Sequence, residues 1–178
     1  MPARWTILII PPLRRADPVR LFLVHHGEAV DPGIDARRPL TEQGCDEVAR
    51  LAQAASGKGA HPDIVWHSGK LRARQTAEAF WRACNPLATF SATRDLQPDD
   101  PPGWMRDRVL GETRDILIAG HFPHLPRLLA LLLGSRPDEI GLADGPGSFP
   151  LHGVVALATE DDGATWEELW RLTATFRR

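Results

Sequence analysis

The 178-residue chain has few of the features that mark several large classes of protein. It contains only two cysteines, Cys45 and Cys84, and they form no Cys-x-x-Cys pair, so the sequence predicts neither a zinc ribbon nor a redox motif. We expect both to be reduced thiols in a cytoplasmic protein. The net charge is −2, which gives no electrostatic reason to expect a nucleic-acid partner.

Long apolar segments are also missing. The apolar run at residues 7–10 is too short for a membrane span or for a signal-peptide core, and two prolines follow it, so we expect no membrane association. We interpret residues 1–18 as an N-terminal extension, in which residues 5–10 are a candidate extra strand. Residues 19–178 are expected to form a single domain, because 43% hydrophobic and 25% charged residues are typical of one globular unit.

Apolar runs and amphipathic segments alternate along the rest of the chain. Thr41 suits the cap of a first helix, and Gly134 suits the end of the last one. A hairpin signal at residues 160–163 separates two final strands. Strands are expected at 19–26, 63–67, 88–94, 115–119, 154–159 and 166–173, helices at 41–56, 70–84, 104–113 and 125–133, and loops at 98–103 and 135–152. This order predicts an α/β fold, a three-layer α/β/α sandwich with a mixed, mostly parallel sheet.

Three of the apolar runs end in polar or ionisable residues. The segments that follow them are His25-His26-Gly27-Glu28, Ser68 to Arg72, and Gly120-His121. Open α/β sheets bind ligands at the carboxyl ends of their strands. If the runs are neighbouring strands, His26, Arg72 and His121 converge at one edge of the sheet.

Together these segments resemble the histidine phosphatase superfamily, which has the phosphoglycerate mutase-like fold. The motifs that carry the resemblance are His25-His26-Gly27 for the family's Arg-His-Gly, Arg38-Pro39-Leu40-Thr41-x-x-Gly44, Ser68-x-x-x-Arg72-Ala73-x-Gln75-Thr76, and Gly120-His121. The chain is most similar to the short bacterial phosphohistidine phosphatases of the SixA-like group. Its length and the segment Pro-Leu-Thr-x-x-Gly-Cys-Asp-Glu at residues 39–47 support that likeness.

The resemblance implies a role for each matching residue. His26 is the nucleophile that accepts the phosphoryl group, and His121 is a second catalytic histidine. Phosphate binding falls to Arg38, Ser68 and Arg72, and to position 25, where His25 replaces the family's arginine. A bound phosphate dianion is expected to favour the charged form of His25. A phosphohistidine intermediate that water hydrolyses requires no cofactor and no metal.

Many members of this family carry a glutamate after the third strand as general acid. The corresponding segment here is Asp95-Leu96-Gln97-Pro98-Asp99-Asp100, so Asp99 and Asp100 are the candidate acids. A histidine leaving group, with a pKa of about 6.5, is protonated without a dedicated acid. Phosphohistidine of a signalling or phosphotransfer protein is therefore the expected substrate. Glu28 is expected to fix loop geometry, and His67 and His124 to lie behind the site or at the surface.

Three other functions stay open. The chain could hydrolyse a small phosphorylated metabolite, or it could bind phosphate groups without turnover because His25 replaces arginine. The third is a metal-dependent hydrolase that uses His25, His26, His121 and His124, although no carboxylate or thiolate stands at a supporting spacing.

Overall fold

The computed structural model describes residues 17–135 and 148–174. Most of the expected extension, including the candidate strand at residues 5–10, lies outside these residues. The elements are β1 (Val19–His25), α1 (Glu42–Gly57), β2 (Ile64–His67), α2 (Leu71–Cys84), β3 (Thr89–Ala92), the 3-10 helix η1 (Arg94–Leu96), α3 (Pro102–Val109), β4 (Ile116–Gly120), α4 (His124–Leu132), β5 (Gly153–Thr159) and β6 (Glu167–Thr173). None of the described helices is long and apolar enough to cross a membrane.

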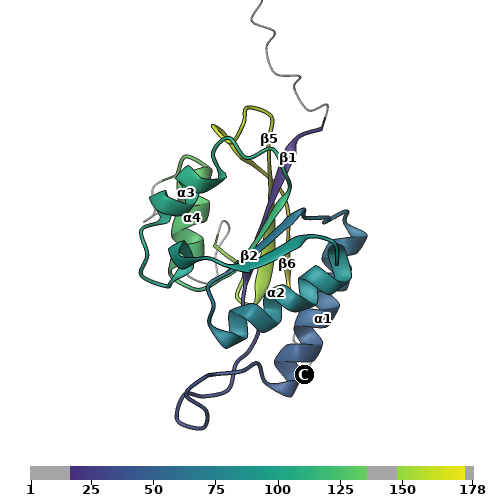
Figure 1. Cartoon of the computed structure of the whole chain (residues 1–178), viewed down its shortest axis with the longest axis vertical. Helices are drawn as coiled ribbons and strands as arrows, with labels where there is room; N and C mark the ends of the chain where they lie inside the picture. Colours follow the sequence, from purple (N-terminus) through teal and green to yellow (C-terminus); the bar gives the residue numbers. More distant parts are fainter. Residues whose placement is uncertain (1–16, 136–147, 175–178) are drawn as a thin grey trace, which may run out of the picture.

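The six strands form one mixed sheet in the order β3-β2-β4-β1-β5-β6. Strands β3, β2, β4 and β1 are parallel, whereas β5 runs antiparallel to β1 and β6 runs antiparallel to β5. Helices α1 and α2 cover one face of the sheet, and α3 and α4 cover the other (Figure 1). The predicted three-layer α/β/α sandwich is therefore confirmed.

Successive side chains of β1 alternate between the two faces of the sheet, so this one strand packs against both helical layers. Phe22 and Val24 pack in the cluster that includes side chains of α1 and α2. Leu21 and Leu23 pack in the cluster that includes side chains of α3 and α4. Because successive side chains of a strand point to opposite faces, an uninterrupted apolar run is what a strand covered on both faces requires.

The third helix differs from its prediction. It was expected at 104–113, after a loop at 98–103, but α3 begins at Pro102 and ends at Val109. Proline is well tolerated at the first helical position, where its missing N–H has no helical partner, so Pro102 and Gly103, the last two residues of the expected loop, begin the helix. Leu110 then adopts extended backbone angles and Gly111 has a φ of 75°, which end the helix.

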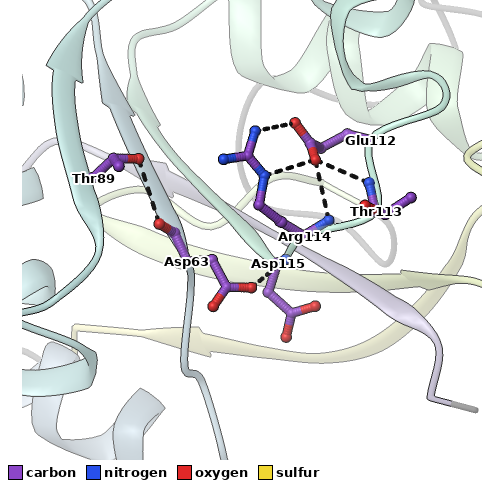
Figure 2. A network of polar contacts seen from close by, with 6 residues as sticks. All are labelled: Asp63, Thr89, Glu112, Thr113, Arg114 and Asp115. Atoms are coloured by element: carbon purple, nitrogen blue, oxygen red, sulfur yellow. Dashed lines mark hydrogen bonds and ion pairs between the residues drawn. The ribbon is translucent and has the colours of Figure 1, made fainter. Parts of the chain in front are cut away.

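The amino ends of the parallel strands are joined by carboxylates (Figure 2). The backbone N–H of Asp115 donates to Asp63 Oδ2 at 3.1 Å, and the N–H of Arg20 donates to Asp115 Oδ1 at 3.0 Å. Beside them the Glu112 carboxylate accepts hydrogen bonds from the Arg114 guanidinium and from backbone N–H groups. These contacts align β1, β2 and β4 at the edge opposite the one where the predicted site residues lie.

Candidate active site

The carboxyl edge of the sheet brings the predicted site residues together. His26 follows β1 and His121 follows β4, and these two parallel strands pair with His25 opposite Gly120. The ring centroids of His26 and His121 are 5.1 Å apart. Ser68 follows β2, and Arg72 lies in the first turn of α2, where the helix dipole also favours an anion. His26, Arg72 and His121 therefore converge at one edge of the sheet, as expected from the sequence.

The hydrogen bonds of His26 fix its tautomer. Its Nδ1–H donates to the carbonyl oxygen of Gly27 at 2.8 Å, and the Arg72 Nε–H donates to its Nε2 at 3.1 Å. A carbonyl can only accept and a guanidinium can only donate, so the proton is on Nδ1 and the lone pair is on Nε2. Burial, with the nearby charge of Arg72, lowers the pKa of His26 to about 4. The ring is therefore neutral near pH 7, with a nucleophilic Nε2.

The turn after His26 is locked to α2. The Gly27 N–H donates to Thr76 Oγ1 at 3.1 Å, and the Thr76 hydroxyl donates to the Arg72 carbonyl at 2.8 Å. A side chain at Gly27 would overlap Val48, so the close approach requires glycine. The positions of His26 and Arg72 are thus set by one shared network.

The Arg-Pro-Leu-Thr segment supports the same turn from the other side. Thr41 caps α1 by accepting the Gly44 N–H at 2.9 Å, and its hydroxyl donates to Glu28 Oε2 at 3.0 Å. The N–H of Leu40 donates to Gln75 Oε1 at 2.8 Å. Glu28 therefore holds loop geometry, as expected from the sequence.

His121 is almost completely buried, with 2% of its surface exposed, and shares a hydrogen bond of 2.6 Å between its Nε2 and Ser68 Oγ. Its Nδ1 has no hydrogen-bond partner among the residues described. Burial, followed by the proximity of His26 and Arg72, lowers the pKa of His121 to about 3. His121 is a neutral imidazole beside His26, with Ser68 setting its orientation.

Cations surround the two histidines. Arg38, whose φ of 51° places it in the left-handed region, donates from Nε to the Val30 carbonyl at 3.2 Å. The charge of Arg38 lowers the pKa of His26. Burial is the main cause that lowers the pKa of Arg72, and the charge of Arg38 adds to it. The charge of Lys70 acts on His121 in the same direction. Arg38, Lys70 and Arg72 together give this edge of the sheet a positive potential, which favours a bound anion.

His25 is buried against aromatic rings. It is 5% exposed, and its ring centroid lies 4.2 Å from that of Phe122 and 4.4 Å from that of His26. Burial, helped by the neighbouring histidines and Arg72, lowers its pKa to about 2. In the unliganded protein the ring is therefore uncharged, because it is desolvated and its neighbours oppose a positive charge. The expectation that a bound phosphate dianion favours its charged form is not tested by this observation.

The sequence interpretation missed His152. Its ring Nδ1–H donates to the His26 carbonyl at 2.6 Å, and its backbone N–H donates to His25 Nδ1 at 3.0 Å. It lies in the expected loop at 135–152, of which residues 136–147 fall outside the described part of the chain. Only the antiparallel pairing of β5 with β1 brings this residue to the site, and local sequence carried no signal of that register.

The two candidate acids lie on the loop between η1 and α3. Asp99 is exposed, whereas Asp100 Oδ2 accepts the Gln97 N–H at 2.7 Å. The Gln97 side chain in turn donates to the Ser68 carbonyl at 2.8 Å, which connects this loop to the site. The assignment of either aspartate as general acid stays a prediction.

His67 and His124 are also buried. His67 accepts the Gly69 N–H at its Nδ1, and His124 is 0% exposed, with neither ring nitrogen paired to a described residue. Neither is at the surface. Within residues 17–135 and 148–174, no three histidine, cysteine or acidic side chains are arranged to hold a metal ion.

Known proteins share this architecture. The model of the histidine phosphatase superfamily (branch 1) matches residues 21–97. Phosphohistidine phosphatase SixA of Escherichia coli (strain K12) is 25% identical over 150 residues, which cover 82% of this chain and 88% of that protein. The structure of the protein histidine phosphatase SixA complexed with tungstate is 25% identical, with a TM-score of 0.71 over 88% of this chain and 97% of that one.

A more distant structure shares the fold alone. Phosphoglycerate mutase from Plasmodium falciparum is 16% identical, with a TM-score of 0.59 over 85% of this chain and 92% of that one. The predicted resemblance and the phosphoglycerate mutase-like fold are confirmed, and the similarities support a phosphatase activity in general.

Proposed function

We infer that this chain, a SixA-like relative of the histidine phosphatase superfamily, removes the phosphoryl group from phosphohistidine in a protein through a covalent intermediate on His26. The observation that carries this proposal is the state of His26. Its ring is neutral, its proton is held on Nδ1 by the Gly27 carbonyl, and its Nε2 lone pair faces the Arg72 guanidinium.

The reaction proceeds in two displacements. In the first, His26 Nε2 forms a bond to phosphorus, the substrate P–N bond breaks, and its electron pair leaves with the substrate imidazole. In the second, water attacks phosphorus, the bond to His26 breaks, and inorganic phosphate departs. Arg72 and Arg38 stabilise the charge on the equatorial phosphoryl oxygens in both steps. The dipole at the start of α2 adds to this stabilisation.

The loop that carries the candidate acids favours phosphohistidine over alkyl phosphoesters. An alkoxide leaving group needs a proton from the enzyme, whereas an imidazole leaving group, with a pKa of about 6.5, takes one from solvent. Asp100 is engaged by the Gln97 N–H, and Asp99 is exposed. A small phosphorylated metabolite is the alternative substrate, and it requires one of these aspartates to reach the leaving oxygen.

The test compares leaving groups. Phosphate release is measured from a histidine-phosphorylated carrier protein, from free phosphohistidine, from an aryl phosphate and from phosphoserine. We expect the carrier protein to be the best substrate, the aryl phosphate to react more slowly, and phosphoserine to be nearly inert. A preference for phosphoserine would favour the metabolite alternative. Phosphate binding without release from any donor would favour a non-catalytic, phosphate-binding protein.

Arg72→Lys is expected to weaken inhibition by vanadate by about 1–3 kcal/mol, the scale of a hydrogen bond to a charged group. Lysine keeps the charge but cannot present two parallel donors to a phosphate-like anion. Arg74→Lys is the matched control, because Arg74 is an exposed arginine on the same helix. Equal vanadate inhibition in the Arg72→Lys variant and in the wild type would place Arg72 outside the anion site.

A further inference from the structure

The hydrogen bonds of His25 define a neutral donor. Its Nδ1 accepts the backbone N–H of His152 at 3.0 Å. A ring nitrogen that accepts carries no proton, so the proton of neutral His25 is on Nε2. The His25 ring lies against the His26 ring, with 4.4 Å between the centroids, so its Nε2–H is the hydrogen-bond donor that His25 has beside His26.

His152 holds both residues at the end of β1. Its backbone N–H contacts His25, its ring Nδ1–H donates to the His26 carbonyl, and its ring stacks on His25 with 5.2 Å between centroids. Its φ of 49° lies in the left-handed region, which is rare for a residue other than glycine. In this conformation the backbone N–H and the ring of His152 reach His25 and His26 at the same time.

We propose that His152 is a positioning residue that fixes His25 as an uncharged Nε2–H donor to the phosphoryl group and holds the backbone of His26. The inference rests on the proposed function and deepens it. A directional N–H then takes the place of the cation that the family motif has at position 25. The groups that act on His25 are His26, His121, His152 and Arg72. Each of them disfavours a charge on His25 in the unliganded protein, and its accepting Nδ1 leaves the Nε2–H as the donor.

Substitutions of His25 separate donor from charge. Glutamine can accept from the His152 N–H and donate to phosphate while staying neutral, whereas leucine can do neither. We expect His25→Leu to lower kcat/KM by roughly 10- to 150-fold, the range of a hydrogen bond to a charged group, and His25→Gln to keep roughly tenfold more activity than His25→Leu. His25→Arg should fall below the wild type, because it buries a charge and leaves the His152 N–H unpaired. Activity of His25→Arg above wild type at pH 8 would overturn the proposal.

His152→Gly isolates the ring of His152. Glycine keeps the backbone N–H and tolerates the left-handed conformation, so only the contacts of the imidazole are lost. We expect kcat to fall at least tenfold, with an unchanged urea midpoint and an unchanged tautomer of His25. Wild-type kcat in this variant would overturn the role of the His152 ring in positioning His26.

Nitrogen-15 NMR of the imidazole rings tests the tautomer independently of activity. We expect wild-type His25 to show the Nε2–H form from pH 6 to pH 8. An imidazolium or an Nδ1–H signal would overturn the proposal. If the wild type hydrolyses no donor, the proposed function fails. The role of His25 is then decided by its tautomer and by calorimetry, which compares phosphate binding to the wild type with binding to the His25→Leu variant. Equal affinities would contradict that role.

Discussion

Replacing His26 with alanine is expected to abolish phosphate release and covalent labelling of the protein by its substrate. The neutral Nε2 is the only atom that the proposed mechanism uses to accept phosphorus, so the loss should reach roughly 10⁴-fold or more, as when other covalent nucleophiles are removed. Labelling is measured by transfer of radioactive phosphate from a histidine-phosphorylated carrier, which should give a phosphoenzyme that acid, but not alkali, decomposes.

Two controls make the His26 result interpretable. His61→Ala removes an exposed histidine and should leave turnover and labelling unchanged. Calorimetric binding of inorganic phosphate shows that the His26→Ala variant keeps its anion site, because Arg38 and Arg72 are intact. Wild-type phosphate release by His26→Ala would exclude His26 as the nucleophile. If the wild type is labelled but releases no phosphate, the second displacement, in which water attacks phosphorus, is the step that fails.

The stability of the fold is expected to fall steeply as the pH drops below about 6.5. Burial holds the pKa values of His25, His121 and His26 at about 2, 3 and 4 in the folded protein. In the unfolded chain these rings take up protons near the ordinary value of 6.5. Below that pH the unfolded state therefore binds more protons than the folded state, and protonation favours unfolding.

The size of this effect follows from linkage. Each histidine that protonates only in the unfolded state costs about 1.4 kcal/mol per pH unit, so three together cost up to about 4 kcal/mol per unit between about pH 6 and pH 4. A domain with about 5–10 kcal/mol of stability, the lower part of the typical range, would then unfold above about pH 4. Urea midpoints at pH 8, 6.5 and 5.5 test this. A constant midpoint over that range would show that the rings are not held neutral.

His124 offers a matched control for the acid effect, because it lies outside the proposed chemistry. It is fully buried, and burial lowers its pKa although the charge of Asp100 acts in the opposite direction. His124→Leu should raise stability more at pH 5.5 than at pH 8, whereas His61→Ala should change neither. Equal gains at both pH values would mean that packing, and not proton uptake, explains the effect.

Much of the site could be predicted because its residues follow apolar strands in sequence. His26 and His121 end strands that pair in parallel, and Arg72 begins the helix after a third strand, so local pattern and strand order were enough to bring them together. The burial of His25 could not be predicted, because it depends on Phe122 and His152 packing around the ring. No local pattern encodes that burial.

The antiparallel course of β5 has a consequence for how the site can be divided. Because β5 runs against β1, the chain enters β5 at the edge where β1 ends, and residues 127 apart in sequence meet there. The family model matches residues 21–97, which contain His26 and the two groups that set its tautomer, Gly27 and Arg72, but neither His121 nor His152. A fragment limited to that match would lack β4 and β5, and with them the two histidines whose rings lie against His26 and His25. The proposed site is accordingly complete only in the full six-stranded sheet, and we expect recovery of phosphate release on refolding to report the docking of β5.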